Sequence, residues 1–399
     1  MKILVADKFP EQYIDKLKSL STGVDYNPKL GASELADAVG DANVLIVRST
    51  VVNERCISHS KELSLIIRAG AGVNNIDLKA ASAKGIYVAN CPGKNSIAVA
   101  ELAMGLILAI DRKIPDNVVD FRGKKWNKAL YSKADGLFGK KLGVVGTGKI
   151  GFELIKRAQS FGIEVYAWSR SLTPEAAELI GVHFCKTIED LIDACDIVSV
   201  HLALKPETRG IISKDIIGRM KPGTIFINTA RAEVVDEDAL IEAVEAGTIK
   251  AGLDVFIDEP EQKDGEFSSK LQGIKNIYVT HHIGASTDQA QNAVAEDAVD
   301  IVREYMQEGR VRNWVNRSKA SEAEWQLIVR HYDKPGVLAN VLAVLKEGDI
   351  NVQELENVIF DGNIAACCTM QLDARPTDGM LEEIRSRTDE VISAMLISV

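Results

Sequence analysis

The sequence predicts an α/β protein with two doubly wound parallel-sheet units and a smaller C-terminal unit. Short apolar runs rich in Val and Ile alternate with helical patterns from residue 1 to about 283. These runs are continuously hydrophobic, as expected for parallel strands buried on both faces. Beyond residue 324 the pattern changes to strand, helix, strand, strand, helix, strand. A chain of 399 residues is also too long for one core, so two or three domains are expected.

The first unit is predicted from four strands in residues 1–95, which lie in KILVAD, NVLIVRS, LSLIIRAG and GIYVAN. A long apolar helical pattern from Asn95 to Asp111 then links it to the second unit. The helical pattern from Thr287 to Glu308 has no strand after it, so we expect it to pack back on the first unit. The first domain would then be discontinuous and comprise residues 1–95 and 287–315.

The second unit, residues 96–286, is predicted from six further strands and contains a glycine-rich turn. Gly146, Gly148 and Gly151 form GTGKIG, which includes Lys149 and Ile150, directly after the strand KLGVV and at the start of a helical pattern. Glycines there allow a tight turn and close approach to a pyrophosphate, and the helix N-terminus supplies N–H donors. This context predicts a Rossmann dinucleotide site, whereas an isolated glycine motif would be weak evidence.

The residues expected at the ribose differ from the usual NAD pattern. The second strand of an NAD-binding unit commonly ends in Asp or Glu, which bonds the ribose 2′-hydroxyl. Here EVYAWSR places Ser169 and Arg170 at that point. A small hydroxyl beside a cation predicts tolerance of NADP as well as NAD. Alternatively, Arg170 stacks on the adenine or is simply solvated.

The C-terminal unit, residues 325–399, follows a polar linker from Asn316 to Glu324. Its strand and helix order is ferredoxin-like. A unit of this size can form its own core, and at the end of an enzyme it is more often regulatory or oligomerising than catalytic.

Composition excludes several classes of function. The charge sum of 47 basic and 57 acidic residues is −10, with no concentrated basic patch, so nucleic acid is not an expected partner. The longest apolar stretch, Leu102 to Ile110, is about half a membrane span, and the N-terminus lacks a signal-peptide pattern. The six cysteines form no CxxC or zinc spacing. We therefore expect a cytoplasmic protein with mostly buried thiols, no bound metal and no membrane contact.

Three later strands are each followed by a polar residue suited to chemistry: Arg231, Glu259 and His282. Ligands of open α/β sheets lie at the carboxyl ends of strands, so these side chains could meet above one nicotinamide. His282 suits proton exchange with a 2-hydroxy acid, Glu259 would stabilise its imidazolium, and Arg231 would hold the substrate carboxylate. Each residue alone also has an ordinary structural explanation. His281 is the competing histidine, and we expect it to be structural.

Several segments together resemble the D-isomer-specific 2-hydroxyacid dehydrogenases. They are RAGAGVNNID, GTGKIG, NTARAEVVDEDAL, AGLDVFIDEP and HHIGAST, and they cover most of residues 1–315. The resemblance implies a flavodoxin-like substrate domain, a Rossmann nucleotide domain, and catalytic roles for Arg231, Glu259 and His282. It also places Ala230 and Asp254 near the cofactor. The Gly that usually follows the catalytic Arg is Ala232 here.

Within that family, the resemblance is strongest to the members that oxidise 3-phosphoglycerate in serine synthesis. It implies a substrate site with cations for the phosphate, formed by Arg48, Ser49, Arg68, Gly72 and Asn74. It further implies that Lys128 is donated by a partner subunit in a homodimer or homotetramer. Surface salt bridges are the alternative for each of these cations.

The C-terminal unit resembles an ACT domain through HYDKPGVLANV and GDINV. The resemblance implies that serine or another amino acid binds as an effector at His331, Asp333 and Asn351. The middle position is often Asn in serine-inhibited enzymes, so Asp333 leaves the effector open. A purely structural role in assembly is the alternative.

Two other functions remain open at this point. A glyoxylate or hydroxypyruvate reductase is favoured by Ser169 and Arg170 but disfavoured by the paired arginines and the added C-terminal unit. A dinucleotide-sensing corepressor would have kept this fold and lost turnover. The presence of Arg231, Glu259 and His282 disfavours it.

Overall fold

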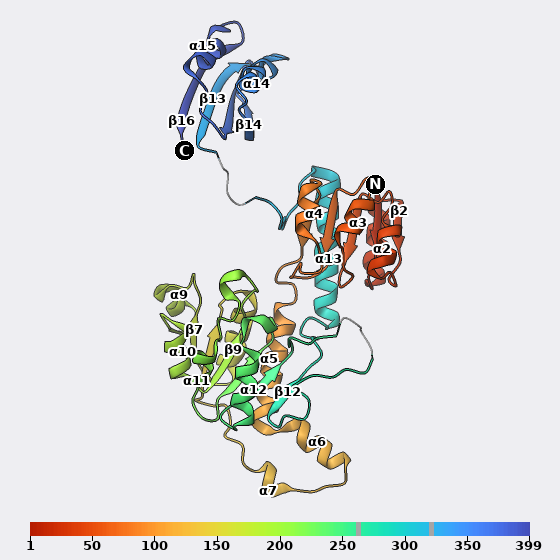
Figure 1. Cartoon of the computed structure of the whole chain (residues 1–399), viewed down its shortest axis with the longest axis vertical. Helices are drawn as coiled ribbons and strands as arrows, with labels where there is room; N and C mark the ends of the chain where they lie inside the picture. The colour runs from red at the N-terminus through yellow and green to blue at the C-terminus, as the bar shows by residue number, and fades with distance from the viewer. Residues whose placement is uncertain (261–264, 319–322) are drawn as a thin grey trace. The chain divides into compact units, whose positions relative to one another are not determined.

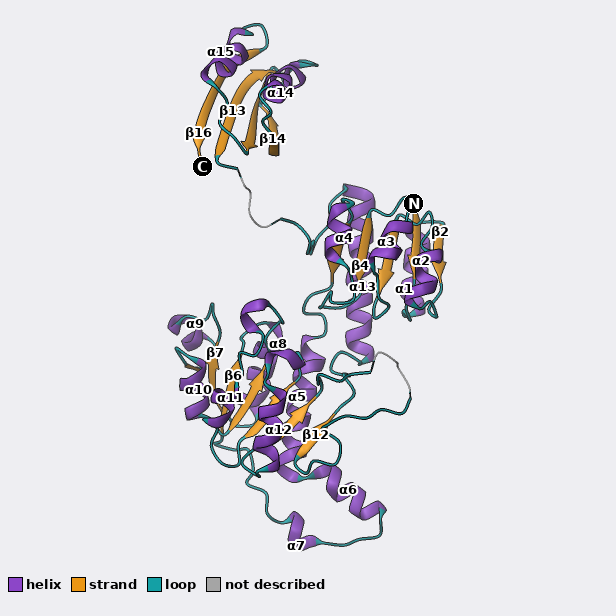
Figure 2. Ribbon diagram, viewed as in Figure 1, coloured by secondary structure: helices purple, strands orange, loops and turns teal. Residues whose placement is uncertain are grey.

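The structure, a computed structural model, describes residues 1–260, 265–318 and 323–399. The chain divides into two compact units, Met1–Asn316 and Arg317–Val399. The first unit contains two parallel sheets flanked by helices, and the second contains one antiparallel sheet (Figures 1 and 2). The predicted fold class is therefore confirmed. The boundaries after residues 95 and 286, within the first unit, stay a prediction.

The first sheet has the strand order β2-β1-β3-β4-β5, and all its pairs are parallel. This is the flavodoxin-like order, with its switch point between β1 and β3. Strand β2, a short edge strand with little burial, was not predicted from the sequence. The strands are β1 (Lys2–Val5), β2 (Gly23–Tyr26), β3 (Val44–Val47), β4 (Leu65–Arg68) and β5 (Tyr87–Asn90).

Five helices cover this sheet. Apolar residues of α13, including Val294, Ile301 and Val302, pack in the same core as strand residues Ile3 and Ile67. The expected return of this segment to the first sheet is thus present in the packing. The helices are α1 (Glu11–Leu20), α2 (Ala32–Ala38), α3 (Glu54–His59), α4 (Leu78–Ala83) and α13 (Asp288–Glu308).

The second sheet has the order β12-β11-β10-β9-β6-β7-β8, and its strand pairs are again parallel. It is the Rossmann order extended by one strand. The two-residue edge strand β8 was not anticipated. The strands are β6 (Lys141–Val145), β7 (Glu164–Trp168), β8 (His183–Phe184), β9 (Ile197–Val200), β10 (Ile225–Asn228), β11 (Lys250–Leu253) and β12 (Ile277–Val279).

The helices of the second sheet bury its two faces. The long apolar helix α5 contributes Ala103, Leu106 and Ile107 to the same core as Val144 and Ile227. These contacts place the linking helix against the second sheet. The helical segments are α5 (Ser96–Arg112), α8 (Lys149–Ser160), α9 (Pro174–Leu179), α10 (Ile188–Ala194), η1 (Pro206–Thr208), α11 (Lys214–Gly218), η2 (Ala232–Val234) and α12 (Glu237–Glu245).

An arm of two helices, α6 (Ile114–Arg122) and α7 (Lys128–Tyr131), separates α5 from β6. Neither helix contains a buried residue. Phe121 is 68% exposed and Trp126, between the helices, is 82% exposed. The arm is internally linked, because the Tyr131 hydroxyl donates to Asp120 at 2.8 Å. It therefore presents apolar surface that this chain does not cover.

The C-terminal unit is an antiparallel sheet of order β14-β15-β13-β16 with two helices, in the predicted strand and helix order. Its core includes Leu327, Val329, Val341 and Met370. The edge strand β14 is exposed along nearly all its length. The elements are β13 (Trp325–Tyr332), α14 (Val337–Glu347), β14 (Val352–Ile359), β15 (Ala365–Leu372), α15 (Asp378–Ser386) and β16 (Val391–Ser398).

The six cysteines are all free, and five of them are buried. Cys367 is the partly exposed one, because side chains alternate along β15. Burial raises the pKa of Cys56 to about 11, which suppresses thiolate formation. Among the described residues, no helix has both the length and the apolar character needed to cross a membrane.

Candidate active site

The glycine-rich turn follows β6 and opens α8. Gly146 has a φ of +104°, and an added Cβ would lie 2.6 Å from the carbonyl oxygen of His201. A Cβ on Gly151 would lie 2.0 Å from the carbonyl oxygen of Gly146, so this glycine permits close packing of helix on strand. Gly148 is the N-cap residue just before α8, and a Cβ there would meet nothing within 4 Å. The turn therefore leaves space in front of the helix N-terminus, as a pyrophosphate requires.

A cavity of about 370 Å³ beside this turn is lined by Gly146, Gly148, Ser169 and Arg170. The Ser169 hydroxyl lies 2.7 Å from that of Thr147. Arg170 is exposed and forms no ion pair with any residue that the structure describes. A hydroxyl and a cation thus stand where β7 ends, and the residues fit the adenosine half of a dinucleotide.

His201 lines the same cavity and was not identified from the sequence. Its Nε2 lies 2.8 Å from the hydroxyl of Ser199, whereas its buried Nδ1 has no hydrogen-bond partner among the described residues. Burial lowers its pKa to about 4, so the ring is neutral near pH 7. His201 could have been predicted from the sequence, because it follows β9 at the carboxyl edge of the sheet, where ligands bind.

The other predicted cofactor residues are in the glycine-rich turn itself or follow β10. The Lys149 ammonium donates to the carbonyl of Pro92 at 3.2 Å, which joins α8 to the segment before α5. Ile150 is the next residue of α8 and is half-buried. The Ala230 N–H donates to the Asn228 side chain at 3.0 Å, in the turn that follows β10. Their cofactor contacts stay predictions.

Glu259 and His282 form the predicted pair. Glu259 Oε2 lies 2.6 Å from Nδ1 of His282, and Glu259 Oε1 accepts the N–H of Phe256 at 3.1 Å. The hydrogen bond with Glu259 raises the pKa of His282, although burial opposes the shift. The Glu259 interaction occupies Nδ1, so Nε2 is the ring nitrogen left to exchange a proton with a substrate.

The backbone at His282 has a φ of +52°, which is unusual for a residue with a Cβ. The 1%-exposed Asp254 holds this loop. Its carboxylate accepts the Thr280 hydroxyl at 2.6 Å and the N–H groups of Ile283 and Gly284 at 2.9 and 2.8 Å. Asp254, predicted near the cofactor, thus positions the histidine loop, and a direct cofactor contact stays a prediction.

Arg231 follows β10 and is half-buried. Its Nη1 donates to the carbonyl of Ala230 at 2.7 Å. A Cβ on Gly72 would lie 2.5 Å from Nη2 of Arg231 and 3.7 Å from Oδ1 of Asn74. The predicted residues Gly72 and Asn74 are therefore beside the predicted catalytic arginine.

Arg68 ends β4, and Arg48 follows the neighbouring strand β3, whose last residue, Val47, pairs with Arg68. Both line a cavity of about 510 Å³ together with Ser49 and His282. Burial, with repulsion from Arg231 and Arg48, lowers the pKa of Arg68 to about 10. Among the described residues, no carboxylate forms an ion pair with any of the three arginines, and Arg68 Nε is buried without a hydrogen bond. Such a cluster is ready for an anionic ligand.

Asp7, at the end of β1, orders the loop that carries Arg48 and Ser49. Its Oδ2 accepts the N–H groups of Arg48, Ser49 and Thr50 at 2.7, 3.0 and 2.9 Å. Burial would raise the pKa of Asp7, but these backbone hydrogen bonds outweigh it and the pKa is lowered. The side chain therefore stays ionised at the switch point of the first sheet.

Two further polar residues of the large cavity were missed. Asn95, just before α5, has a buried Oδ1 without a hydrogen bond among the described residues. Gln291, on α13, accepts Nη1 of Arg48 at 3.1 Å. Nothing in a single sequence distinguishes these amides from ordinary helix-surface residues. Only the fold brings them to the arginines.

Lys128 is not with the other predicted substrate residues. It begins α7 in the exposed arm and lines neither the cavity of Arg48 and Arg68 nor that of Glu259. His281, by contrast, lines a cavity of about 620 Å³ together with Glu259 and His282, although only His282 contacts the carboxylate.

The predicted effector residues do not meet within one copy of the C-terminal unit. His331 is opposite Ala366, whereas Val352, which follows Asn351, is opposite Leu372. Six residues of β15 separate these levels, or about 20 Å. His331 is 2% exposed, and its Nε2 lies 3.1 Å from Oδ1 of Asn357. Asp333 is exposed near His331. The three residues therefore do not form a site within one copy, and their binding of an effector stays a prediction.

In the described part of the chain, no three His, Cys, Asp or Glu side chains are grouped as metal ligands.

The family model of the D-isomer-specific 2-hydroxyacid dehydrogenase NAD-binding domain matches residues 104–284. A D-3-phosphoglycerate dehydrogenase of Methanocaldococcus jannaschii is 34% identical over 400 residues, which cover 100% of this chain and 74% of that relative.

A D-3-phosphoglycerate dehydrogenase of Bacillus subtilis is 32% identical over 396 residues, which cover 98% of this chain and 73% of the relative. Among solved structures, NAD⁺-bound 3-phosphoglycerate dehydrogenase of Entamoeba histolytica is 27% identical with a TM-score of 0.66. That similarity covers 79% of this chain and 99% of the other.

Proposed function

The chain belongs to the D-isomer-specific 2-hydroxyacid dehydrogenases, and we propose that it is a D-3-phosphoglycerate dehydrogenase. It would interconvert 3-phosphoglycerate and 3-phosphohydroxypyruvate, the first step of serine synthesis. The observation that carries this proposal is the cluster of Arg48, Arg68 and Arg231, whose guanidinium groups have no carboxylate in ion-pair contact among the described residues. A substrate with both a carboxylate and a phosphate supplies the anions that such a cluster needs.

The chemistry of the chain's own residues follows from their contacts. The nicotinamide, when bound, accepts or returns the hydride of substrate C2. His282 takes the hydroxyl proton at Nε2 during oxidation and returns it during reduction. Glu259 stabilises the protonated ring through its 2.6 Å contact with Nδ1. Arg231 binds the carboxylate and polarises the C2 oxygen.

Arg48 and Arg68 would hold the phosphate. Asp7 fixes the backbone of Arg48 and Ser49, and Gln291 fixes the guanidinium of Arg48. The N–H and hydroxyl of Ser49 already bond Asp7, so we expect Ser49 to shape the site more than to bind the substrate. Asn74, beside Gly72, would align the substrate near Arg231.

The cofactor is a nicotinamide dinucleotide, and we propose that both NAD and NADP are accepted. Ser169 and Arg170 support this proposal, because β7 does not end in the carboxylate that repels a 2′-phosphate. Arg170 has the charge and exposure to meet that phosphate.

We propose that a second copy of the chain completes the substrate site. The exposed apolar side chains of the arm support a homodimer, or a homotetramer built from it, in which the arm brings Lys128 to the partner's substrate site.

The C-terminal unit would act as an ACT domain. Because one copy separates Asn351 from His331 and Asp333, serine or another amino acid would bind between two copies. Six free cysteines support a reducing, cytoplasmic location.

One assay tests the proposed substrate and coenzyme together. The initial rate of reduction is measured for 3-phosphohydroxypyruvate, hydroxypyruvate, glyoxylate and 2-oxoglutarate, each with NADH and NADPH. We expect the highest kcat/KM for 3-phosphohydroxypyruvate and turnover with both coenzymes. Strict use of NADH would overturn the coenzyme proposal alone.

The same assay separates the two alternatives. Preference for glyoxylate or unphosphorylated hydroxypyruvate would favour the simpler reductase, for which Ser169 and Arg170 are the supporting residues. Tight binding of the dinucleotide without turnover of any 2-oxo acid would favour the corepressor. The 2.6 Å contact of Glu259 with His282 argues against that second alternative, since a binding protein has no need of a proton carrier.

A further inference from the structure

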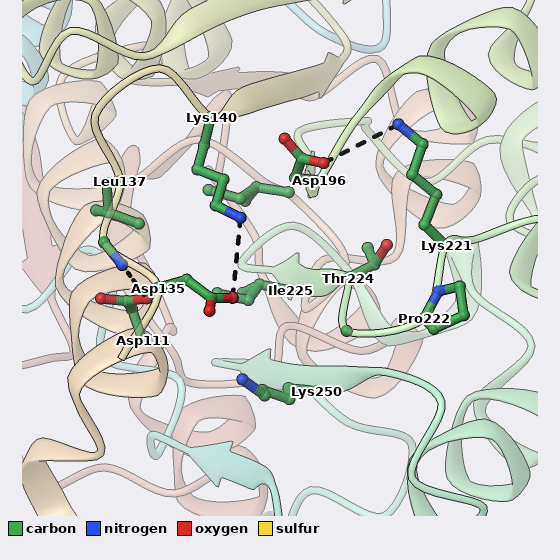
Figure 3. A pocket seen from close by; sticks show the side chains of 13 residues that line it. Asp111, Asp135, Leu137, Lys140, Asp196, Lys221, Pro222, Thr224, Ile225 and Lys250 are labelled. Atoms are coloured by element: carbon green, nitrogen blue, oxygen red, sulfur yellow. Dashed lines mark hydrogen bonds and ion pairs between the residues drawn. The ribbon is translucent and has the colours of Figure 1, made fainter. Parts of the chain in front are cut away.

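A cavity of about 120 Å³ lies at the amino ends of the strands of the second sheet (Figure 3). Asp196 and Thr224 precede β9 and β10, and Lys250 opens β11. Asp111, in the last turn of α5, and Asp135, before β6, complete the lining. The dinucleotide turn is at the carboxyl ends of these parallel strands, so this cavity is separate from the site described above.

Four of the six charged groups around this cavity are already paired. Lys140 lies 3.8 Å from Asp135, and Lys221 lies 4.0 Å from Asp196 (Figure 3). Within each of these two ion pairs, the charges of the lysine and the aspartate neutralise each other. They leave Lys250 and Asp111 as the charges that a ligand can meet.

Three groups in the cavity have unused hydrogen-bonding capacity among the residues that the structure describes. Thr224 is 2% exposed, and its buried hydroxyl has no partner. The Lys250 ammonium forms no hydrogen bond or ion pair, even with Asp111 across the cavity. Asp111 is buried, and its Oδ1 accepts the N–H of Gly136 at 3.1 Å, which leaves Oδ2 free. An unpaired buried hydroxyl is costly, so its presence points to a ligand.

We propose that this cavity binds a small zwitterionic α-amino acid. The ligand carboxylate would accept from Lys250 and Thr224, and its ammonium would donate to Asp111. A simple anion would pair with Lys250 but would leave the Asp111 carboxylate without a counter-charge. An uncharged ligand would leave both Lys250 and Asp111 without a counter-charge. The volume holds about ten water-sized groups, which is enough for an amino acid of the size of glycine, alanine or serine.

Calorimetric titration of the whole chain tests the proposal, with glycine, L-alanine and L-serine as separate probes. We expect saturable binding, and a Kd that rises at least about tenfold in Lys250→Met, Asp111→Asn and Thr224→Val, because each removes one hydrogen-bonding partner. Lys250→Arg should restore most of the affinity. Lys214→Met, which removes an exposed lysine paired with Glu242, is the matched control and should leave the Kd unchanged.

The outcomes are distinct from those of the proposed effector site. Binding that His331→Ala removes but Lys250→Met and Asp111→Asn retain would place the amino acid in the C-terminal unit and overturn the proposal. Failure of all three amino acids to bind at millimolar concentrations would also overturn it. Binding of inorganic phosphate or acetate in place of the amino acids would show that the zwitterion class is wrong. Circular dichroism of each variant checks that it is folded.

Discussion

Glu259 contacts Nδ1 of His282 at 2.6 Å, and the proposed mechanism assigns it control of the proton on that ring. The sequence predicted this pair because each residue follows a strand of the same sheet. It could not predict the positive φ of His282, or that Asp254 fixes the loop through three hydrogen bonds. Those features depend on β11 and β12 lying side by side, which brings Asp254 to residues 280–284.

The pH dependence of substrate oxidation should report this contact. Oxidation needs a neutral His282, and Glu259 raises its pKa above 6.5, so kcat/KM should rise with pH through a pKa above that value. In Glu259→Gln the stabilising charge is lost, and the rise should move to lower pH. Glu266→Gln, which removes another carboxylate of the same cavity, should leave the profile in place. An unchanged profile in Glu259→Gln would contradict the assigned role.

At the scale of elements, buried parallel strands were predictable because their hydrophobic runs are continuous. The edge strands β2 and β8 were missed, since edge positions need little burial and their residues are mixed. Arg48 and Arg68 could be predicted from their places at strand ends, but Asn95 and Gln291 line the same cavity only because α5 and α13 converge on it.

Asp7 links β1 to the loop after β3, so Asp7→Ala should leave three backbone N–H groups without their acceptor. The free energy of unfolding of the first unit should fall by about 3 kcal/mol, and KM for 3-phosphohydroxypyruvate should rise because Arg48 is less well held. Urea titration measures the first quantity. Asp25→Ala, on the exposed edge strand, should change it by less than about 0.5 kcal/mol. Equal loss in the two variants would contradict this role.

The direction in which pH changes the stability of the first unit follows from the titration of Asp7. The pKa of Asp7 is lowered from 3.8, so its contribution is present above about pH 4 and is lost as the pH falls through the folded-state value. Acid should therefore destabilise the wild type more than Asp7→Ala. Parallel acid sensitivity in both proteins would show that other carboxylates dominate.

At the scale of the whole molecule, the sequence predicted two parallel sheets and a separate antiparallel unit, and the structure has all three. It did not predict the exposed arm as an independent feature, because α6 and α7 bury no residue in this chain and so have no core-facing pattern to detect. The separation of the three predicted effector residues was also not predictable, because it depends on the strand register, which places Asn351 at the far end of the sheet from His331.

The arm should hold two copies together. Trp126→Glu combined with Phe121→Glu should convert the dimer to a monomer in light scattering, because both side chains are exposed in this chain. Leu179→Glu, an equally exposed apolar residue on α9, should not change the mass. A monomeric wild type, or a dimer that survives the double change, would contradict the arm's role.

Mixing two inactive variants then tests which subunit supplies Lys128 to the substrate site. Lys128→Ala and His282→Ala subunits, exchanged and reassembled, should recover up to about a quarter of wild-type activity, since random pairing restores one site in half of the dimers. Recovery is expected only if Lys128 acts in the partner's site. Failure to recover in confirmed mixed dimers would place Lys128 in its own chain's site, and full activity of Lys128→Ala alone would place it outside catalysis.

The most direct test of the central claim is the turnover of His282→Ala in the reduction of 3-phosphohydroxypyruvate, with dinucleotide binding measured in parallel. We expect kcat to fall by roughly two to four decades while dinucleotide affinity is unchanged, because only the proton carrier is lost. His281→Ala, the neighbouring control, should keep near wild-type turnover. Near wild-type turnover in His282→Ala would show that His282 is not the proton carrier.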